Sequence, residues 1–424
     1  MKKSVDLRDA ITALFCISWR NSLEEALDLP RAYGNNCREM KRLLLPAIAG
    51  FLFSVGATPA FSEDGPISHY DSDPSGASRA VRVKRGGLAH TSMFTVSESK
   101  PGEEMAALIS QIEEVAKELG SDFSGVAKLN LFVADESPAL LDQIKAQLVN
   151  SWPAGKRPAL TVIPTPLPEN AKIAGDAVIH VESDPMKIKR IEGKAAVMPS
   201  GRDMIYISGR AASGELPEAT SGTMEQLFAV LEHLSASRKD VIQVKAFIRP
   251  MSGWEIVKEE IEKSFGDAPV PPLVFVEWSS SSRATEIELI AAAPDRADTK
   301  MSVSYFTPPG EKSSPVYSRV ARVYSDEIVY ISGTTAPAAE SPEEEVNGVF
   351  QTLKSSAEKA GSGLLHFVKA TYYVSDATVS AKFNELRPEY YDPERPPAAS
   401  KVAVPTVGPA GRGLLVDMVA VPAR

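Results

Sequence analysis

Three stretches of this chain repeat the same order of features, and this repetition restricts the fold more than any other property of the sequence. Each stretch has a helix with apolar residues spaced by three and four, then a strand, then a second helix ending in an aromatic residue, with a proline six positions later. A spacing that recurs three times indicates three copies of one unit. The aromatic–proline pairs are Trp152 and Pro158, Phe265 and Pro271, and Tyr391 and Pro397.

The strands of the copies also correspond. "IYISGR" over 205–210 recurs as "VYISGT" over 329–334, and "GLAHTSM" over 87–93 is a more distant version. The strand between the two helices carries a lysine near its start in every copy, namely Lys128, Lys245 and Lys369. Each copy closes with a further strand, so the unit reads β-β-α-β-α-β-β, an α+β fold in which two helices cover one face of a sheet.

The other face of such a sheet has no helices, and its apolar residues need a partner. We therefore expect three domains, over 79–183, 190–294 and 315–424, to form an intramolecular pseudo-trimer with three sheets around one axis and the helices outward. This arrangement predicts a monomeric protein. The segments "ESDPMKIKR" (182–190) and "PDRADTKMSVSYFTPPGEKSSP" (294–315) are interpreted as linkers between the domains.

A secretory signal peptide is predicted over 40–62. Two cations follow Met40, an apolar run extends from Leu43 to Val55, and small residues at 60 and 62 match a cleavage site. Translation would then start at Met40, residues 1–39 would not be part of the real product, and both cysteines would be absent from the mature chain. We expect an exported protein, periplasmic or secreted, with a disordered linker over 63–78 and no stable membrane anchor after processing.

Composition and motifs exclude several classes of function. The formal net charge of −9 and a pI near 5.3 disfavour binding to nucleic acid, because phosphate backbones require clustered Lys and Arg. The histidines are scattered, so neither a metal site nor a cofactor is predicted. No GxSxG motif appears, which disfavours an acyl-transfer triad. A small-molecule ligand remains the expected partner.

The three copies resemble divergent members of the RidA family, also called the YjgF or reactive intermediate deaminase family, some of whose members are described as L-PSP endoribonucleases. The resemblance is clearest in the third copy. The resemblance is carried, in order, by "VYSRVARV" (316–323), "VYISG" (329–333), "KATYYVSD" (369–376), "FNELRPEYY" (383–391), "PPAAS" and "LLVDMVAV". It implies a chorismate-mutase-like fold that forms trimers with small-molecule sites between neighbouring subunits. It also implies hydrolysis of enamines and imines to 2-oxoacids and ammonia.

In that family an arginine two positions after the marker proline holds the substrate carboxylate through two parallel donors. This chain has Leu160, Leu273 and Ala399 there. The family's water-orienting glutamate matches Glu286 in the second copy, whereas the first and third copies have Ala174 and Leu415. Further matches are the catalytic candidates Tyr317 and Ser332 and the substrate-binding candidate Asn384. Arg210 and Arg283 are candidates for a relocated carboxylate anchor.

No copy has a complete set of family residues, so a site assembled from two copies, with Glu286 on one wall and Tyr317 and Ser332 on the other, is one hypothesis. The alternative is that these are ordinary strand and surface residues. We expect a binding protein for a small organic ligand or a protein, without efficient imine hydrolysis. A working imine deaminase with a relocated anchor is the alternative, and an endoribonuclease is disfavoured by the negative charge. Whether the chain is an enzyme stays open.

Overall fold

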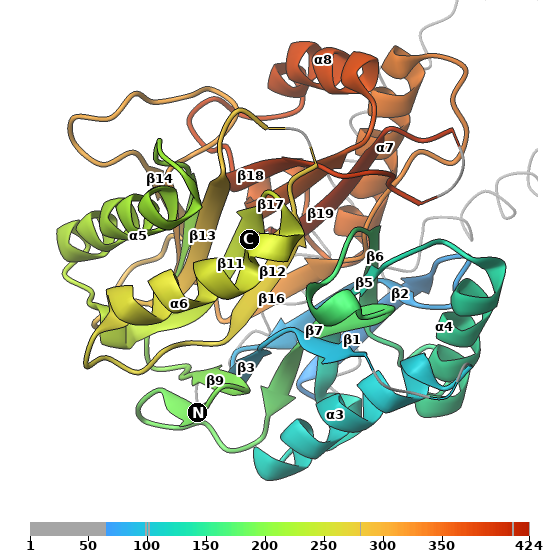
Figure 1. Cartoon of the computed structure of the whole chain (residues 1–424), viewed down its shortest axis with the longest axis horizontal. Helices are drawn as coiled ribbons and strands as arrows, with labels where there is room; N and C mark the ends of the chain where they lie inside the picture. Colours follow the sequence, from blue (N-terminus) through green and yellow to red (C-terminus); the bar gives the residue numbers. More distant parts are fainter. Residues whose placement is uncertain (1–64, 98–99, 101, 280, 409–410, 424) are drawn as a thin grey trace, which may run out of the picture. The chain divides into compact units, whose positions relative to one another are not determined.

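Each repeated stretch folds into two helices packed on strands, in a computed structural model that describes residues 65–424 apart from 98–99, 101, 280, 409–410 and 424 (Figure 1). The predicted signal peptide and the residues before it lie outside the described residues. The elements of the first stretch are β1 (Ile67–Ser72), β2 (Ser78–Lys84), β3 (Gly87–Thr91), β4 (Phe94–Val96), α3 (Glu104–Glu118), β5 (Val126–Val133), α4 (Pro138–Ser151), β6 (Ala159–Pro164) and β7 (Ile173–Val181).

The second and third stretches follow the same order. The second contains β8 (Lys189–Ile191), β9 (Ala195–Met198), β10 (Met204–Arg210), α5 (Leu216–His233), β11 (Val241–Ile248), α6 (Trp254–Phe265), β12 (Leu273–Glu277) and β13 (Thr285–Ala292). The third contains β14 (Val303–Phe306), β15 (Val320–Val323), β16 (Glu327–Ile331), α7 (Pro342–Lys359), β17 (Phe367–Val374), α8 (Ala377–Leu386), β18 (Ala398–Ala403) and β19 (Leu414–Ala420).

Local sequence signals explain where the helices begin. The side chain of Ser341 accepts a hydrogen bond from the backbone N–H of Glu344, and Pro342 is the first residue of α7. The sequence predicts this cap, and the structure confirms it. Ser137 caps α4 and Asp376 caps α8 in the same way. Each helix then buries one apolar face, as α3 does with Leu108, Ile112 and Val115.

The strands form two sheets rather than the three expected from the sequence. One has six strands in the order β12-β11-β13-β10-β15-β14, and the other has thirteen, eleven of them in the order β18-β17-β19-β16-β2-β6-β5-β7-β3-β9-β8. The first and third stretches share the larger sheet because β2 meets β6 through the pair Ser78 and Ala159. The mixed α+β class agrees with the sequence.

The first two strands of each stretch pair with the sheet of another stretch. Strand β2 pairs with β16, β9 pairs with β3, and β15 pairs with β10, all antiparallel. Strands β1 and β14, and the first two residues of β8, lie in segments that the sequence interpretation assigned to linkers, and β1 contradicts the disorder expected over 63–78. They are ordered because each pairs with its neighbouring strand, β1 with β2, β8 with β9 and β14 with β15.

Four apolar clusters account for most of the core. Three of them lie under the helix pairs, one in each stretch, and include Leu108, Leu227 and Phe350. A fourth cluster contains residues of all three stretches, among them Ala127, Ile242 and Val368. Residues Gly65–Arg424 accordingly form one compact unit. Within the described part of the chain, no helix is both long and apolar enough to cross a membrane.

Candidate functional sites

Three serine hydroxyls lie where one stretch meets another. The backbone N–H of Leu160 donates to Ser332 Oγ at 2.7 Å, that of Ala399 to Ser208 Oγ at 2.8 Å, and that of Leu273 to Ser92 Oγ at 3.4 Å. The donors are the residues at the three positions where the family resemblance expects arginine. Each of these three contacts between stretches is called a crossing and is named by its serine, as the Ser332, Ser208 or Ser92 crossing.

A large cavity lies beside the Ser332 crossing and has a volume of about 1100 Å³. Its walls are largely apolar, with hydroxyl and amide groups interspersed, which is the composition of pockets for small organic ligands. The apolar lining includes Leu141, Leu160, Val162, Val407 and Leu415, and the polar lining includes Ser332, Thr334, Thr352 and Thr406.

Two leucines in this cavity stand where family members have functional residues. Leu160 replaces the carboxylate-binding arginine, and Leu415 replaces the water-orienting glutamate. Both side chains are buried, at 5% exposure each. Since hydrocarbon walls penalise a charged group that has no partner, this part of the cavity favours an uncharged moiety.

The charged residues of the cavity are Asp73, Arg79, Glu136 and Lys359. Lys359 forms an ion pair with Asp71. Glu136 accepts a hydrogen bond from Thr406, and partial burial raises the pKa of its carboxyl although this bond opposes the rise. The guanidinium of Arg79 makes no hydrogen bond or ion pair with any described residue. It is therefore the cation of this cavity that remains available to a ligand.

The hydroxyl of Ser332 is hydrogen-bonded to two backbone groups. Besides accepting from Leu160, its hydroxyl donates to the carbonyl of Ser78 at 2.6 Å. The neighbouring Gly333 N–H donates to Leu160 O at 2.9 Å. These bonds tie β16, β2 and β6 together at the edge of the cavity, so the hydroxyl holds the crossing in place.

Glu286 and Tyr317 lie near the Ser208 crossing. The carboxylate of Glu286 covers Gly209, where any side chain would collide with it. Burial, followed by repulsion from Glu288, raises the pKa of Glu286 to about 7. The guanidinium of Arg319 lies 5.0 Å from the centre of the Tyr317 ring, and its charge also acts on Glu286.

A composite site of Glu286, Tyr317 and Ser332, the hypothesis drawn from sequence, is not assembled. Ser332 lines the large cavity and Glu286 does not. The reason is that β13, which carries Glu286, pairs with β10 and so belongs to the crossing of Ser208. Their chemical roles stay predictions.

The remaining candidates occupy different surroundings. Arg210 forms an ion pair with Glu311 at 2.7 Å and is mostly buried. Arg283 is exposed and donates to Ser213. Asn384 is exposed on α8 and accepts a hydrogen bond from Lys401 at 3.0 Å. Neither Arg283 nor Asn384 lines the large cavity.

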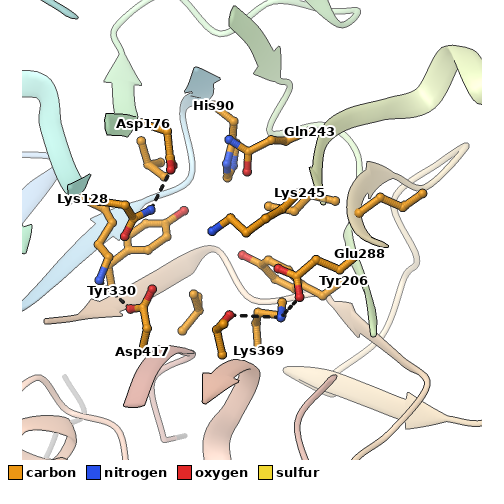
Figure 2. Close-up of a pocket in the computed structure, with 16 residues that line it drawn as sticks. His90, Lys128, Asp176, Tyr206, Gln243, Lys245, Glu288, Tyr330, Lys369 and Asp417 are labelled. Atoms are coloured by element: carbon orange, nitrogen blue, oxygen red, sulfur yellow. Dashed lines mark hydrogen bonds and ion pairs between the residues drawn. The ribbon is translucent and has the colours of Figure 1, made fainter. Parts of the chain in front are cut away.

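A second cavity, of about 60 Å³, lies at the centre where all three stretches meet (Figure 2). The three lysines that recur in the sequence point into it together with one acidic residue from each closing strand. Lys128 binds Asp417 and Lys369 binds Glu288, each at 2.6 Å. No ion pair joins Lys245 to any described carboxylate, and Asp176 instead accepts from Asn130 at 2.9 Å.

The central cavity is strongly desolvated, and this determines its electrostatics. Burial lowers the pKa of His90 to about 4, with Lys245 contributing, so the imidazole is neutral at pH 7. Burial raises the pKa of Asp176. Although burial opposes it, the carboxylates of Asp176, Glu288 and Asp417 raise the pKa of Lys245. Three lysines and three acidic residues thus line this cavity, whose volume suits a few water molecules.

One sequence signal pointed to this centre, because a lysine recurs near the start of the strand between the helices in every copy, although Lys245 lies two positions further along its strand than Lys128 and Lys369 do. Its acidic partners were missed. They occupy corresponding places in the closing strands as Asp176, Glu288 and Asp417. Comparing those strands for a shared charge would have identified them, but only the fold places each acid beside a lysine of another stretch.

Comparisons with known proteins agree with the resemblance for the C-terminal part of the chain. Residues 311–422 match the family model described as Endoribonuclease L-PSP. A curated RutC family protein from Pyrococcus abyssi is 29% identical over 86 residues, which make up 20% of this chain and 67% of that protein. Both findings support the RidA/YjgF family. The family model matches the third stretch.

Solved structures of similar proteins carry the same family names. A YjgF family member from Neisseria meningitidis is 20% identical, with a TM-score of 0.22, and the match covers 30% of this chain and 99% of that one. RidA from an Antarctic Psychrobacter is 26% identical, with a TM-score of 0.21, and the match covers 22% of this chain and 79% of that one.

Proposed function

We propose that this chain is an exported, monomeric pseudo-trimer of three RidA-like domains that binds a small, partly apolar organic molecule without efficient imine hydrolysis. The bound molecule would lie in the cavity beside the Ser332 crossing. The observation that carries the proposal is that Leu160 and Leu415 line this one cavity. The two positions that would hold a substrate carboxylate and orient water are therefore both hydrocarbon.

Replacing the carboxylate-binding arginine and the water-orienting glutamate with leucines has an energetic consequence large enough to affect function. A hydrogen bond to a charged group contributes roughly 1.5–3 kcal/mol. Losing a bidentate guanidinium–carboxylate contact would weaken binding of an imino acid by tenfold to a few hundredfold on the same scale, about 1.4 kcal/mol per factor of ten. Loss of the carboxylate that orients water would slow hydrolysis further. Binding of an uncharged molecule loses neither contribution.

The pseudo-trimer arrangement is supported by two relationships. The first hairpins of the three stretches pair in a cycle, with β2 on β16, β9 on β3 and β15 on β10. The ion pairs of the centre follow a cyclic order as well, from Lys128 to Asp417 and from Lys369 to Glu288. We expect a mass in solution equal to that of one chain. A stable oligomer would contradict the predicted monomeric state.

One assay tests the catalytic part of the proposal. The purified protein is mixed with imines that an amino-acid oxidase generates in situ, and imine decay is followed. We expect decay at the rate of buffer alone.

A second experiment tests binding. Benzyl alcohol as an uncharged probe is titrated by calorimetry against wild type and Leu160→Asp, and only wild type is expected to bind. Accelerated imine decay, or equal binding by both proteins, would refute the proposal.

A second candidate function is an imine deaminase with a relocated anchor, and Arg79 is the observation that favours it. Its guanidinium lines the large cavity without a partner among the described residues, and partial burial raises the pKa of Glu136 in the same cavity, the direction in which a general acid is tuned. This candidate predicts imine decay that is lost in Arg79→Gln and in Glu136→Gln. Arg249→Gln, outside the cavity, is the control.

Export is tested separately. The full chain is expressed in a bacterium with a periplasm, and the fractionated protein is sequenced from its N-terminus. We expect a periplasmic protein that begins at Glu63. An intact N-terminus in the cytoplasmic fraction would contradict export and would leave the binding proposal unaffected.

A further inference from the structure

Glu311 holds two arginine side chains that come from different strands. Its Oε1 lies 2.7 Å from Arg210 Nη2, and its Oε2 lies 3.1 Å from Arg319 Nε. The side chains are only 11% exposed for Arg210 and 23% for both Glu311 and Arg319. Two guanidinium groups thus converge on one carboxylate in a largely desolvated place.

The two arginines are fixed by the strands that carry them. Arg210 ends β10, directly after the Ser208 crossing, and Arg319 directly precedes β15, which pairs with β10. Ser208 N–H donates to the carbonyl of Arg319 at 3.0 Å, which keeps the two backbones together. The backbones that carry the two arginines are therefore held side by side by the sheet, independently of Glu311.

Glu311, in contrast, is carried by the connection between β14 and β15. It follows Pro308, Pro309 and Gly310, and its N–H donates to Pro308 O at 3.2 Å. Gly310 has a φ of 84°, a conformation that glycine adopts without strain. A cavity of about 310 Å³ adjoins this turn and is lined by Arg210, Glu311 and Pro308 among others. The turn belongs to neither strand and has open space beside it.

The contact leaves hydrogen-bonding capacity unused. Arg210 Nε, Arg319 Nε and Glu311 Oε2 are buried and make no hydrogen bond of acceptable geometry, although Arg319 and Glu311 are close enough to attract each other. An arginine can bind an oxyanion through two parallel donors, and Arg210 uses one toward Glu311. A free oxyanion, unconstrained by a loop, could satisfy more of these donors than Glu311 does.

We propose that Glu311 is an internal blocking group in an oxyanion site formed by Arg210 and Arg319. When the turn over 308–311 moves aside, the two guanidinium groups bind an external small oxyanion of carboxylate or phosphate type. Glu286 and Tyr317 lie beside the site, since the Arg319 guanidinium lies 5.0 Å from the centre of the Tyr317 ring and its charge opposes the rise in the pKa of Glu286. This site is separate from the large cavity, so the inference does not depend on the proposed function.

The test compares oxyanion binding with and without the blocking charge. Benzoate and inorganic phosphate are titrated by calorimetry into the purified full chain, as wild type and as Glu311→Gln. Because an attached competitor acts at an effective concentration in the millimolar range, we expect half-saturation of the variant at a concentration at least about tenfold lower. The double variant Arg210→Gln/Glu311→Gln is expected to lose this gain.

Glu327→Gln is the matched control. Glu327 also pairs with a strand arginine, Arg82, and its side chain is 24% exposed against 23% for Glu311. It should show no gain in binding. If Glu327→Gln gains as much as Glu311→Gln, or if Glu311→Gln binds both anions as wild type does, the inference is overturned.

One further measurement completes the test. Thermal unfolding of every variant shows whether it is folded. If Glu311→Gln is unfolded, Glu311→Ala and Glu311→Asn replace it, and failure of these two variants to gain binding while folded refutes the inference. A gain for benzoate alone assigns the site to carboxylates, and a gain for phosphate alone assigns it to phosphoryl groups. Both outcomes support a blocked oxyanion site.

Discussion

Lys369 Nζ lies 2.6 Å from Glu288 Oε2 in the centre of the molecule, where Ser400 also donates to the same carboxylate oxygen. Lys369 belongs to the third stretch and Glu288 to the second, so the pair joins two parts of the chain. Removing one member of a buried pair leaves the other charge without compensation. We therefore expect Lys369→Met to destabilise the fold by about 3–5 kcal/mol, measured by urea unfolding.

The control for this prediction is an exposed pair. Lys117 and Glu113 lie one turn apart on α3, with 65% and 42% of their side chains exposed. Lys117→Met should change the free energy of unfolding little, because solvent screens such pairs. Equal losses in the two variants would mean that the central pair does not hold the stretches together.

His90 should make the fold sensitive to acid. Burial lowers its pKa from an ordinary 6.5 to about 4 in the folded protein, so the unfolded chain binds the proton more tightly. The stabilisation that follows is complete above pH 6.5 and is lost as the pH falls through 4, with a total of about 3 kcal/mol. Urea unfolding of wild type and His90→Gln at pH 7 and pH 4.5 measures it.

The difference between wild type and His90→Gln in stability lost on acidification isolates the contribution of His90. Wild type should lose more stability than His90→Gln between pH 7 and pH 4.5, since the variant has no imidazole to protonate. Parallel losses in the two proteins would show that another group dominates the acid response.

Glu286 should have the opposite dependence on pH. Its pKa is raised from 4.5 to about 7 in the folded state, chiefly by burial, so the folded protein holds the proton more tightly than the unfolded chain does. The contribution of Glu286 to stability is then complete below pH 4.5 and is lost as the pH rises through 7. Glu286→Gln should accordingly be more stable than wild type at pH 8, by about 1–3 kcal/mol.

This advantage of Glu286→Gln should shrink at pH 5, where the wild-type carboxyl is protonated in the folded state. Unfolding curves in urea at pH 5 and pH 8 compare the two proteins. A stability difference that is the same at both pH values would contradict a raised pKa, and would place Glu286 in contact with water.

Local features of this fold could be predicted from the sequence, while its long-range pairings could not. The helix start at Ser341 and Pro342 depends on neighbouring residues only, and it is visible as a motif. Strand β2, by contrast, could have paired with β3, which follows it directly, and it pairs with β16 instead. An apolar strand pattern shows that a strand must be buried, and it does not specify which sheet edge receives it.

The same limit applies to the functional residues. Lys128 is recognisable because it recurs, but its partner Asp417 lies 289 positions away. The serine before glycine in "VYISG" was identified, whereas its bond to Leu160 needed the fold. Glu311 lay in a segment interpreted as a linker, and only the pairing of β15 with β10 brings Arg319 and Arg210 to it.

The hydroxyl of Ser332 should be a structural group at its crossing. Its bonds with Leu160 N–H at 2.7 Å and Ser78 O at 2.6 Å are both buried, so Ser332→Ala leaves a donor and an acceptor unsatisfied. We expect a loss of about 1–3 kcal/mol in the free energy of unfolding. Ser92→Ala is the comparison, because the bond from Leu273 to Ser92 is longer, at 3.4 Å. Ser92→Ala should therefore lower the free energy of unfolding less than Ser332→Ala does. Of these two serines only Ser332 lines the large cavity, so we expect weaker binding of benzyl alcohol for Ser332→Ala and not for Ser92→Ala. Unchanged stability of Ser332→Ala would leave its hydroxyl free for a catalytic role.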